Sequence, residues 1–179
     1  MVQSPLAPCV VIMAGLPGTG KSTLATALVA ELGGIVFDKD RVRAALFPEP
    51  WIEYSQRQDD FCIEVLLQAA GYLLARSHVP SFIFIDGRVF AFRYQLERVA
   101  NWATCAGCEL KIIYTTCSNE TAYQRLNAGR HVANNRNYDL YLELKARFES
   151  IDRPKLTINT EQNVDCSVTQ CSSYLRGNQ

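Results

Sequence analysis

The chain has 179 residues, of which 48% are hydrophobic and 20% charged, so a disordered or collagen-like chain is excluded. Its 18 basic and 18 acidic residues cancel. This balance excludes the chain-wide positive field that drives bulk binding to nucleic acids or anionic membranes. The length predicts a single domain over residues 1–179.

No stretch approaches the roughly 18 apolar residues that a membrane span needs, and no positively charged leader precedes the first apolar run, 9–14. We therefore expect no membrane partner and a cytoplasmic location. In such a compartment the seven cysteines are expected to be reduced thiols. Cys105 and Cys108 form a CxxC pair without a second pair at zinc spacing, which favours two free thiols over a zinc knuckle or a redox pair.

Short β-branched runs alternate with helical patterns along the chain, and this order predicts an open parallel sheet wrapped by helices. The expected strands are 9–14, 35–37, 81–86, 110–115 and 155–159. Helices are expected at 21–32, 42–47, 54–77, 92–104, 119–127, around 141–151 and, weakly, after the last strand. The polar segment 129–137 is predicted to be a loop.

The glycine-rich segment after the first strand decides the class of protein. Its sequence, Gly-Leu-Pro-Gly-Thr-Gly-Lys-Ser at 15–22, fills every fixed position of GxxxxGK[ST] between a predicted strand and a predicted helix. Backbone amides at a helix N-terminus cradle phosphates, Lys21 reaches the β- and γ-phosphates, and Ser22 offers a hydroxyl to Mg²⁺. The segment therefore predicts a Mg·ATP site made by Gly15, Pro17, Gly18, Thr19, Gly20, Lys21, Ser22 and Thr23.

The rest of the chain points to a kinase among proteins with such a loop. A guanine-specific GTPase is expected to carry an Asn-Lys-x-Asp segment near the fourth strand, and 114–118 has none. Large motor ATPases need a much longer chain. An arginine-bearing polar segment before the last helix is typical of a phosphotransferase with a lid, here expected at about 125–137.

The end of the second strand predicts an acceptor site. Its residues include Asp38, Asp40 and Arg43, and ligands of open α/β sheets bind at the carboxyl ends of the strands. A carboxylate can accept a hydroxyl proton while an arginine fixes an anionic or polar acceptor. Asp40 is also well placed to cap the short helix that follows, and this alternative stays open.

The chain resembles the small P-loop kinases of the zeta-toxin, chloramphenicol-phosphotransferase and polynucleotide-kinase-like group. The resemblance is carried by GLPGTGKSTLA, by FDKDRVR at the second strand, by FIDGR at the third and by a lid with RL…GR. It implies a three-layer P-loop fold with strand order 2-3-1-4-5, and transfer of the γ-phosphoryl group of Mg·ATP to a hydroxyl.

The resemblance also implies roles for single residues. Asp40 would be the general base, Arg43 would hold a phosphate of the acceptor, and Asp38 would help the metal through water. Asp86 would be a metal-side carboxylate or a brace for Arg43, and these alternatives stay open. A lid arginine would stabilise the transition state, and we favour Arg125 and Arg130 over Arg136.

A mixture of aromatic and basic residues follows the second and third strands, where acceptor pockets form in this group. An aromatic–arginine mixture can stack on a base or an aromatic substrate, although core aromatics with surface arginines are the plainer interpretation. These residues are Trp51, Tyr54, Arg57, Arg88, Phe90, Phe92 and Arg93.

The leading hypothesis is an ATP-dependent kinase of a hydroxyl on a small molecule or nucleotide sugar. Asp38, Asp40, Arg43, Asp86 and Arg88 would bind the acceptor, and catalysis would rest on Asp40, Lys21 and Arg130. Two alternatives remain: a 5′-hydroxyl polynucleotide kinase, which the zero net charge disfavours, and a switch that hydrolyses ATP slowly without an acceptor.

Overall fold

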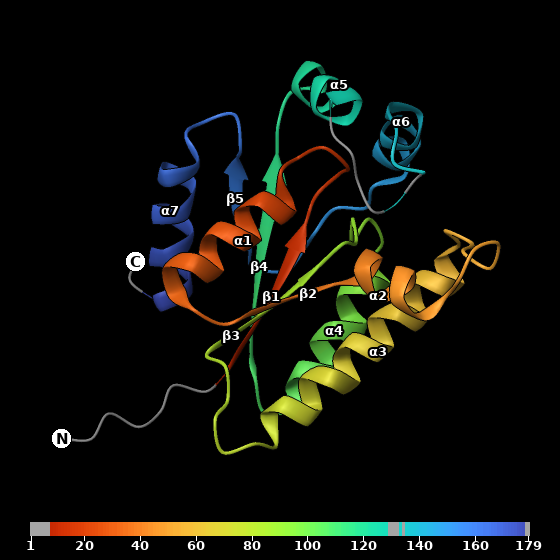
Figure 1. The fold of residues 1–179 in the computed structure, drawn as a ribbon. Helices are drawn as coiled ribbons and strands as arrows, with labels where there is room; N and C mark the ends of the chain where they lie inside the picture. Colours follow the sequence, from red (N-terminus) through yellow and green to blue (C-terminus); the bar gives the residue numbers. More distant parts are fainter. Residues whose placement is uncertain (1–7, 129–132, 134, 178–179) are drawn as a thin grey trace.

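The computed structural model of the protein describes residues 8–128, 133 and 135–177. Its strands form one parallel sheet in the order β2-β3-β1-β4-β5, which confirms the predicted order (Figure 1). The strands are β1 (Cys9–Ala14), β2 (Ile35–Asp38), β3 (Phe82–Asp86), β4 (Glu109–Thr116) and β5 (Leu156–Asn159). The helices are α1 (Lys21–Leu32), α2 (Lys39–Leu46), α3 (Gln56–Leu74), α4 (Arg93–Cys105), α5 (Asn119–Ala128), α6 (Tyr138–Arg147) and α7 (Val164–Arg176).

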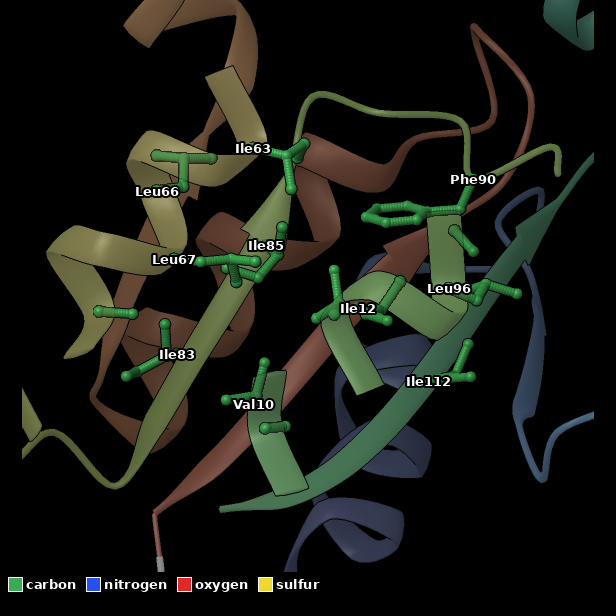
Figure 2. Close-up of a cluster of buried hydrophobic side chains, with 14 of the residues drawn as sticks. Val10, Ile12, Ile63, Leu66, Leu67, Ile83, Ile85, Phe90, Leu96 and Ile112 are labelled. Carbon is green, nitrogen blue, oxygen red and sulfur yellow. The ribbon is translucent and has the colours of Figure 1, made fainter. Parts of the chain in front are cut away.

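Strand β1 lies at the centre of the sheet, and its side chains are buried on both faces. Alternate residues point to opposite sides of a strand, so Val10 and Ile12 enter one apolar cluster and Val11 and Met13 enter the other. The first cluster contains side chains of α3 and α4 (Figure 2), and the second contains side chains of α1 and α7. Because helices cover both faces of the sheet, a continuous apolar run forms its central strand.

Helix α2 begins three residues earlier than its pattern predicts. The Asp38 carboxylate caps it by accepting hydrogen bonds from the backbone N–H groups of Asp40, at 2.8 Å, and Arg41, at 3.4 Å. The alternative that Asp40 is the cap is therefore wrong. As a consequence, Asp40 lies in the first turn of α2, where its side chain is free for other contacts.

The carboxyl ends of the parallel strands meet at one edge of the sheet. The glycine-rich loop joins β1 to α1 there, and Asp38 and Asp86 are paired neighbours at the ends of β2 and β3. Helices α5 and α6 lie beyond the same edge (Figure 1). Among the described residues, no helix is long and apolar enough to cross a membrane.

Candidate functional site

The glycine-rich loop packs closely against β4. Gly15 has a φ of +139°, and a Cβ on it would lie 2.5 Å from the carbonyl oxygen of Thr115. Only glycine fits such a position without displacing the neighbouring strand. The Thr19 hydroxyl also ties the loop together, because it donates to the carbonyl oxygen of Leu16 at 2.7 Å.

Lys21 is buried beneath this loop. Its Nζ donates to the carbonyl oxygens of Gly15, at 2.7 Å, and Leu16, at 2.9 Å. Burial, followed by the charge of Arg136, lowers the pKa of Lys21 to about 7, while Asp86 and Asp40 act in the opposite direction. A lysine held in this way is poised to gain a proton when a polyanion binds beside it.

A cavity of about 510 Å³ lies on one side of the loop, between α5 and the segment that follows β5. It will be called the nucleotide cavity, and its lining includes Gly18, Gly20, Thr23, Leu24, Arg125, Leu126, Arg136, Thr160 and Gln162. Its size is within the range of small-molecule sites. The structure therefore places the glycine-rich loop and a cavity side by side, as a nucleotide site requires.

Of the two favoured lid arginines, Arg125 joins the walls of the nucleotide cavity. Its guanidinium donates to the carbonyl oxygen of Gly18, at 3.4 Å, and to Thr160 Oγ1 and O, at 2.9 and 2.8 Å. These contacts hold α5 against the glycine-rich loop and the end of β5. Arg130, the other favoured arginine, lies outside the described residues.

A second cavity, of about 280 Å³, lies on the other side of Lys21 and will be called the acceptor cavity. Pro17, Lys21 and Ser22 line it from the glycine-rich loop and the start of α1. The rest of its polar wall comes from α2 and the start of α3, and its far wall comes from α6 and the segment after β3. The lysine at the base of the glycine-rich loop thus faces the acceptor cavity.

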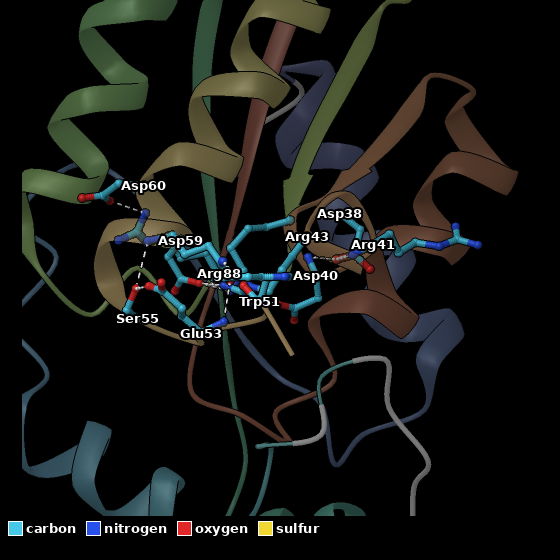
Figure 3. A network of polar contacts seen from close by, with 12 residues as sticks. Asp38, Asp40, Arg41, Arg43, Trp51, Glu53, Ser55, Asp59, Asp60 and Arg88 are labelled. Carbon is cyan, nitrogen blue, oxygen red and sulfur yellow. Dashed lines mark hydrogen bonds and ion pairs between the residues drawn. The ribbon is translucent and has the colours of Figure 1, made fainter. Parts of the chain in front are cut away.

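Four charged residues, Lys39, Asp40, Arg43 and Asp59, form a buried ion-pair network that will be called the α2–α3 network (Figure 3). Lys39 Nζ is 2.9 Å from Asp40 Oδ1 and 2.7 Å from Asp59 Oδ1. Arg43 Nη1 is 2.8 Å from Asp40 Oδ1, and Arg43 Nη2 also pairs with Asp59. Burial lowers the pKa of Lys39 to about 8, and the Asp40 carboxylate opposes that shift. Both ion pairs of Asp40, with Lys39 and with Arg43, are made by its Oδ1 atom.

Asp86 is buried at the end of β3, and neither of its carboxylate oxygens has a hydrogen-bond partner within the described part of the chain. Its neighbour Asp38 has a raised pKa, first because of burial and then because of the Asp86 charge. Arg43 pairs with Asp40 and Asp59, so Asp86 is not its brace.

Unsatisfied carboxylate oxygens near a phosphate-binding loop fit Mg²⁺, which is usually held by one or two carboxylates, substrate phosphates and water. Asp86 would supply the carboxylate, and Ser22 a hydroxyl from the start of α1. No cluster of three or more His, Cys, Asp or Glu suited to a metal occurs among residues 8–128, 133 and 135–177. The donor set therefore suits an ion that arrives with the nucleotide.

Arg136 lines both cavities. Burial lowers its pKa, and the charges of Asp40, Asp86 and Asp38 oppose that shift, so it lies within reach of all three carboxylates. Sequence reasoning ranked it below Arg125 and Arg130 because nothing in a polar loop distinguishes one arginine from another. Its position next to Lys21 became visible only in the fold.

The aromatic and basic residues expected around the acceptor divide into two sets. Tyr54, Arg88 and Phe92 line the acceptor cavity, whereas Phe90 is part of the core. Trp51, Arg57 and Arg93 do not line it. Lys39 and Asp59 do line it and were not singled out from the sequence. Asp59 belongs to a helix whose polar residues follow the pattern of an ordinary solvent-exposed face. The cysteines, including Cys105 and Cys108, are free thiols.

Comparisons with known proteins give the family and the fold of the chain. A family model described as AAA domain matches residues 10–150, 141 of the 179 residues. The chain belongs to this family. No curated protein matches this member of the AAA domain family significantly.

Solved structures give this family member a P-loop kinase fold. A kinase candidate from Chloroflexus aurantiacus has a TM-score of 0.72 and 20% identity, over 98% of this chain and 100% of the other. A gluconokinase from Sinorhizobium meliloti has a TM-score of 0.68 and 14% identity, over 97% of this chain and 94% of the other. The APS kinase of Mycobacterium tuberculosis, solved with AMPPNP and APS, has a TM-score of 0.68 and 16% identity, over 97% of this chain and 99% of the other. The predicted three-layer α/β fold and the resemblance to small P-loop kinases are thereby confirmed.

Proposed function

We propose that the protein is an ATP-dependent phosphotransferase that moves the γ-phosphoryl group of ATP to a hydroxyl of a small molecule. The observation that carries the proposal is the pair of cavities that share Arg136, one of which is also lined by Lys21. A slow hydrolytic switch needs only the nucleotide cavity. A kinase needs a second cavity lined by a carboxylate, and Asp40 supplies one here.

In the proposed reaction, the acceptor hydroxyl lies next to Asp40. The hydroxyl oxygen forms a bond to the γ-phosphorus, the bond from that phosphorus to the bridging oxygen breaks, and ADP leaves. The hydroxyl proton passes to the Asp40 carboxylate, whose Oδ1 is held by Lys39 and Arg43, so that Oδ2 can face the acceptor. Positioning and charge stabilisation supply most of the catalysis in such transfers.

The charge that develops on the transferred group would be met by Lys21, which lines the acceptor cavity, and by Arg136, which lines both cavities. Arg125 would serve the nucleotide site by holding α5 against the loop. Mg²⁺, when bound with ATP, would neutralise phosphate charge, and Ser22 and Asp86 are the residues that would hold it. We assign the transition-state role to Arg136 because it lines both the nucleotide cavity and the acceptor cavity.

The test compares ATP binding and phosphoryl transfer in two variants. Asp40→Asn is expected to bind ATP as the wild type does and to lose transfer to any acceptor by about 100-fold or more, because general base catalysis contributes about that much. Lys21→Ala is expected to lose both. Transfer that survives in Asp40→Asn at the wild-type rate would overturn the proposal for this carboxylate.

A further inference from the structure

Apart from Lys21 and Arg136, every charged side chain that lines the acceptor cavity forms an ion pair with a side chain of opposite charge. Besides the α2–α3 network, Arg88 Nη1 lies 2.6 Å from Asp60 Oδ1 (Figure 3), and Arg147 Nη1 lies 3.0 Å from Glu143 Oε1. Together with the network, these pairs set four cations of the lining against four carboxylates, of which Asp60 pairs with Arg88 without lining the cavity itself. The wall that would receive the acceptor therefore carries no net charge.

Two cations of this cavity have no carboxylate pair within the described part of the chain. They are Arg136, which also lines the nucleotide cavity, and Lys21, which lies close enough to feel the charge of Arg136. A nucleoside triphosphate carries enough negative charge to engage both of them. Neither is therefore available to neutralise a charge on the acceptor.

Arg43 is not available for that purpose either. Its side chain is 2% exposed, and its guanidinium already contacts Asp40 and Asp59. A second anion placed beside it would face two carboxylates as well as the arginine. Burying a charge without its own partner is strongly unfavourable, so the α2–α3 network discriminates against a charged acceptor.

The apolar side chains of the cavity lie away from the network, on a wall that also carries the paired charges of Arg88, Glu143 and Arg147. That wall is formed by the segment after β3, by α6 and by the residue Ala133, and its apolar members are Val89, Ala91, Phe92, Ala133, Leu140 and Leu144. Such a wall favours an apolar body. The cavity volume, about 280 Å³, is close to the lower end of the range for small-molecule sites, which suits a metabolite better than a polymer.

Resting on the proposed kinase function, we infer that the acceptor is an uncharged, amphipathic alcohol. Its hydroxyl would reach Asp40, and its apolar part would lie against Phe92 and Leu140. This assignment differs from the role that the family resemblance implies for Arg43, which would then order Asp40 and Asp59 instead of holding a phosphate of the acceptor.

Fractionation of a metabolite extract tests this inference. The extract is separated at neutral pH into anionic, uncharged and cationic fractions, and each is incubated with the protein, Mg²⁺ and ATP labelled at the γ-phosphate. We expect a labelled product from the uncharged fraction alone and, after reversed-phase separation, from its retained part.

Each other outcome overturns a defined part of the account. Label only in a product of the anionic or cationic fraction overturns the inferred charge class and leaves the kinase function standing. Label only from the unretained part of the uncharged fraction overturns the apolar component. Label from no fraction overturns the proposed function and this inference with it.

A variant of the α2–α3 network gives an independent test with the acceptor so identified. Asp59→Asn leaves one cation in excess, so the KM for the uncharged acceptor should rise about tenfold, and sulfate should become a competitor of the acceptor at saturating ATP. Glu64→Gln, an exposed change on the same helix, is the matched control and should alter neither. An unchanged KM in Asp59→Asn, or equal competition by sulfate in the wild type, contradicts the inference.

Discussion

At the scale of single residues, the site combines groups from one continuous segment, the glycine-rich loop, with charged groups that meet only in the folded chain. Lys21 and Ser22 could be assigned from the GxxxxGK[ST] pattern alone because the loop is one continuous segment. Asp59 could not, because its partners Lys39 and Arg43 are 20 and 16 residues away and meet it only when α3 packs beside α2. Arg136 likewise acquires its charged neighbours from the end of β2, the start of α2 and the end of β3.

The lowered pKa of Lys21 predicts that ATP binding takes up a proton. The ligand-free lysine has a pKa of about 7, and the phosphates should raise that value toward its ordinary range. At about pH 8 the free protein is largely deprotonated at Lys21 and the complex is not, so calorimetry in buffers of different ionisation enthalpy should detect uptake of up to about one proton. The affinity for ATP should fall as the pH rises above about 7.

The control for this measurement is Lys21→Arg, whose guanidinium stays protonated throughout the pH range. It should take up fewer protons than the wild type in the same buffers. Equal uptake by the two proteins would place the proton elsewhere.

At the scale of elements, the sequence predicts the strands to within one or two residues, because each is an apolar run bounded by turns. The start of α2 is the instructive exception. The hydrophobic pattern locates its apolar residues from Val42, but the helix begins at Lys39 because an Asp38 oxygen satisfies two backbone donors. That shift of one turn brings Asp40 and Arg43 onto the face that meets α3.

Asp38 combines a capping role with an unfavourable charge, and two substitutions separate them. Its pKa is raised in the folded protein, so deprotonation costs stability as the pH rises from the unfolded to the folded value. Asp38→Asn keeps a capping oxygen and removes the charge, so it should be at least as stable as the wild type at neutral pH. Asp38→Ala should lose about 1 kcal/mol in urea unfolding. A less stable Asn variant would contradict this assignment.

Gly87 controls how closely the end of β3 approaches α2. Its φ is +81°, and a Cβ there would lie 2.5 Å from Asp38 Oδ1 and 2.8 Å from the backbone nitrogen of Lys39. Gly87→Ala should therefore cost about 2–4 kcal/mol of unfolding free energy, because backbone must move. Gly107→Ala, with a φ of +68° and open space around it, should cost only about 1–2 kcal/mol. Equal losses would show that the close approach is unimportant.

At the scale of the whole molecule, the parallel sheet brings the parts of the site together. Strand order 2-3-1-4-5 puts the ends of β1, β2 and β3 next to one another, so the glycine-rich loop, Asp38 and Asp86 meet at one edge. This much follows from the alternation of strands and helices. The division of that edge into two cavities does not, because it depends on where α5, α6 and the loop before α3 fold back.

If the acceptor is uncharged, its KM should be insensitive to salt. The protein has no net charge, and its acceptor wall is matched in charge, so the KM for the acceptor should change less than about twofold between about 50 and 200 mM salt. A 5′-hydroxyl polynucleotide would instead lose affinity steeply over that range, because its phosphates would release counterions on binding. A steep dependence, measured at constant Mg·ATP, would favour the polynucleotide.

The most direct test of the account is the fate of the γ-phosphate. ATP labelled at that position is incubated with the protein and the unfractionated metabolite extract, and label in organic product is compared with label in inorganic phosphate. For the wild type we expect most of the transferred label in an organic phosphate ester, and for Asp40→Asn we expect that ester to disappear while ATP is still bound. Label released only as inorganic phosphate, equally by both proteins, would contradict a kinase that uses Asp40 as its base.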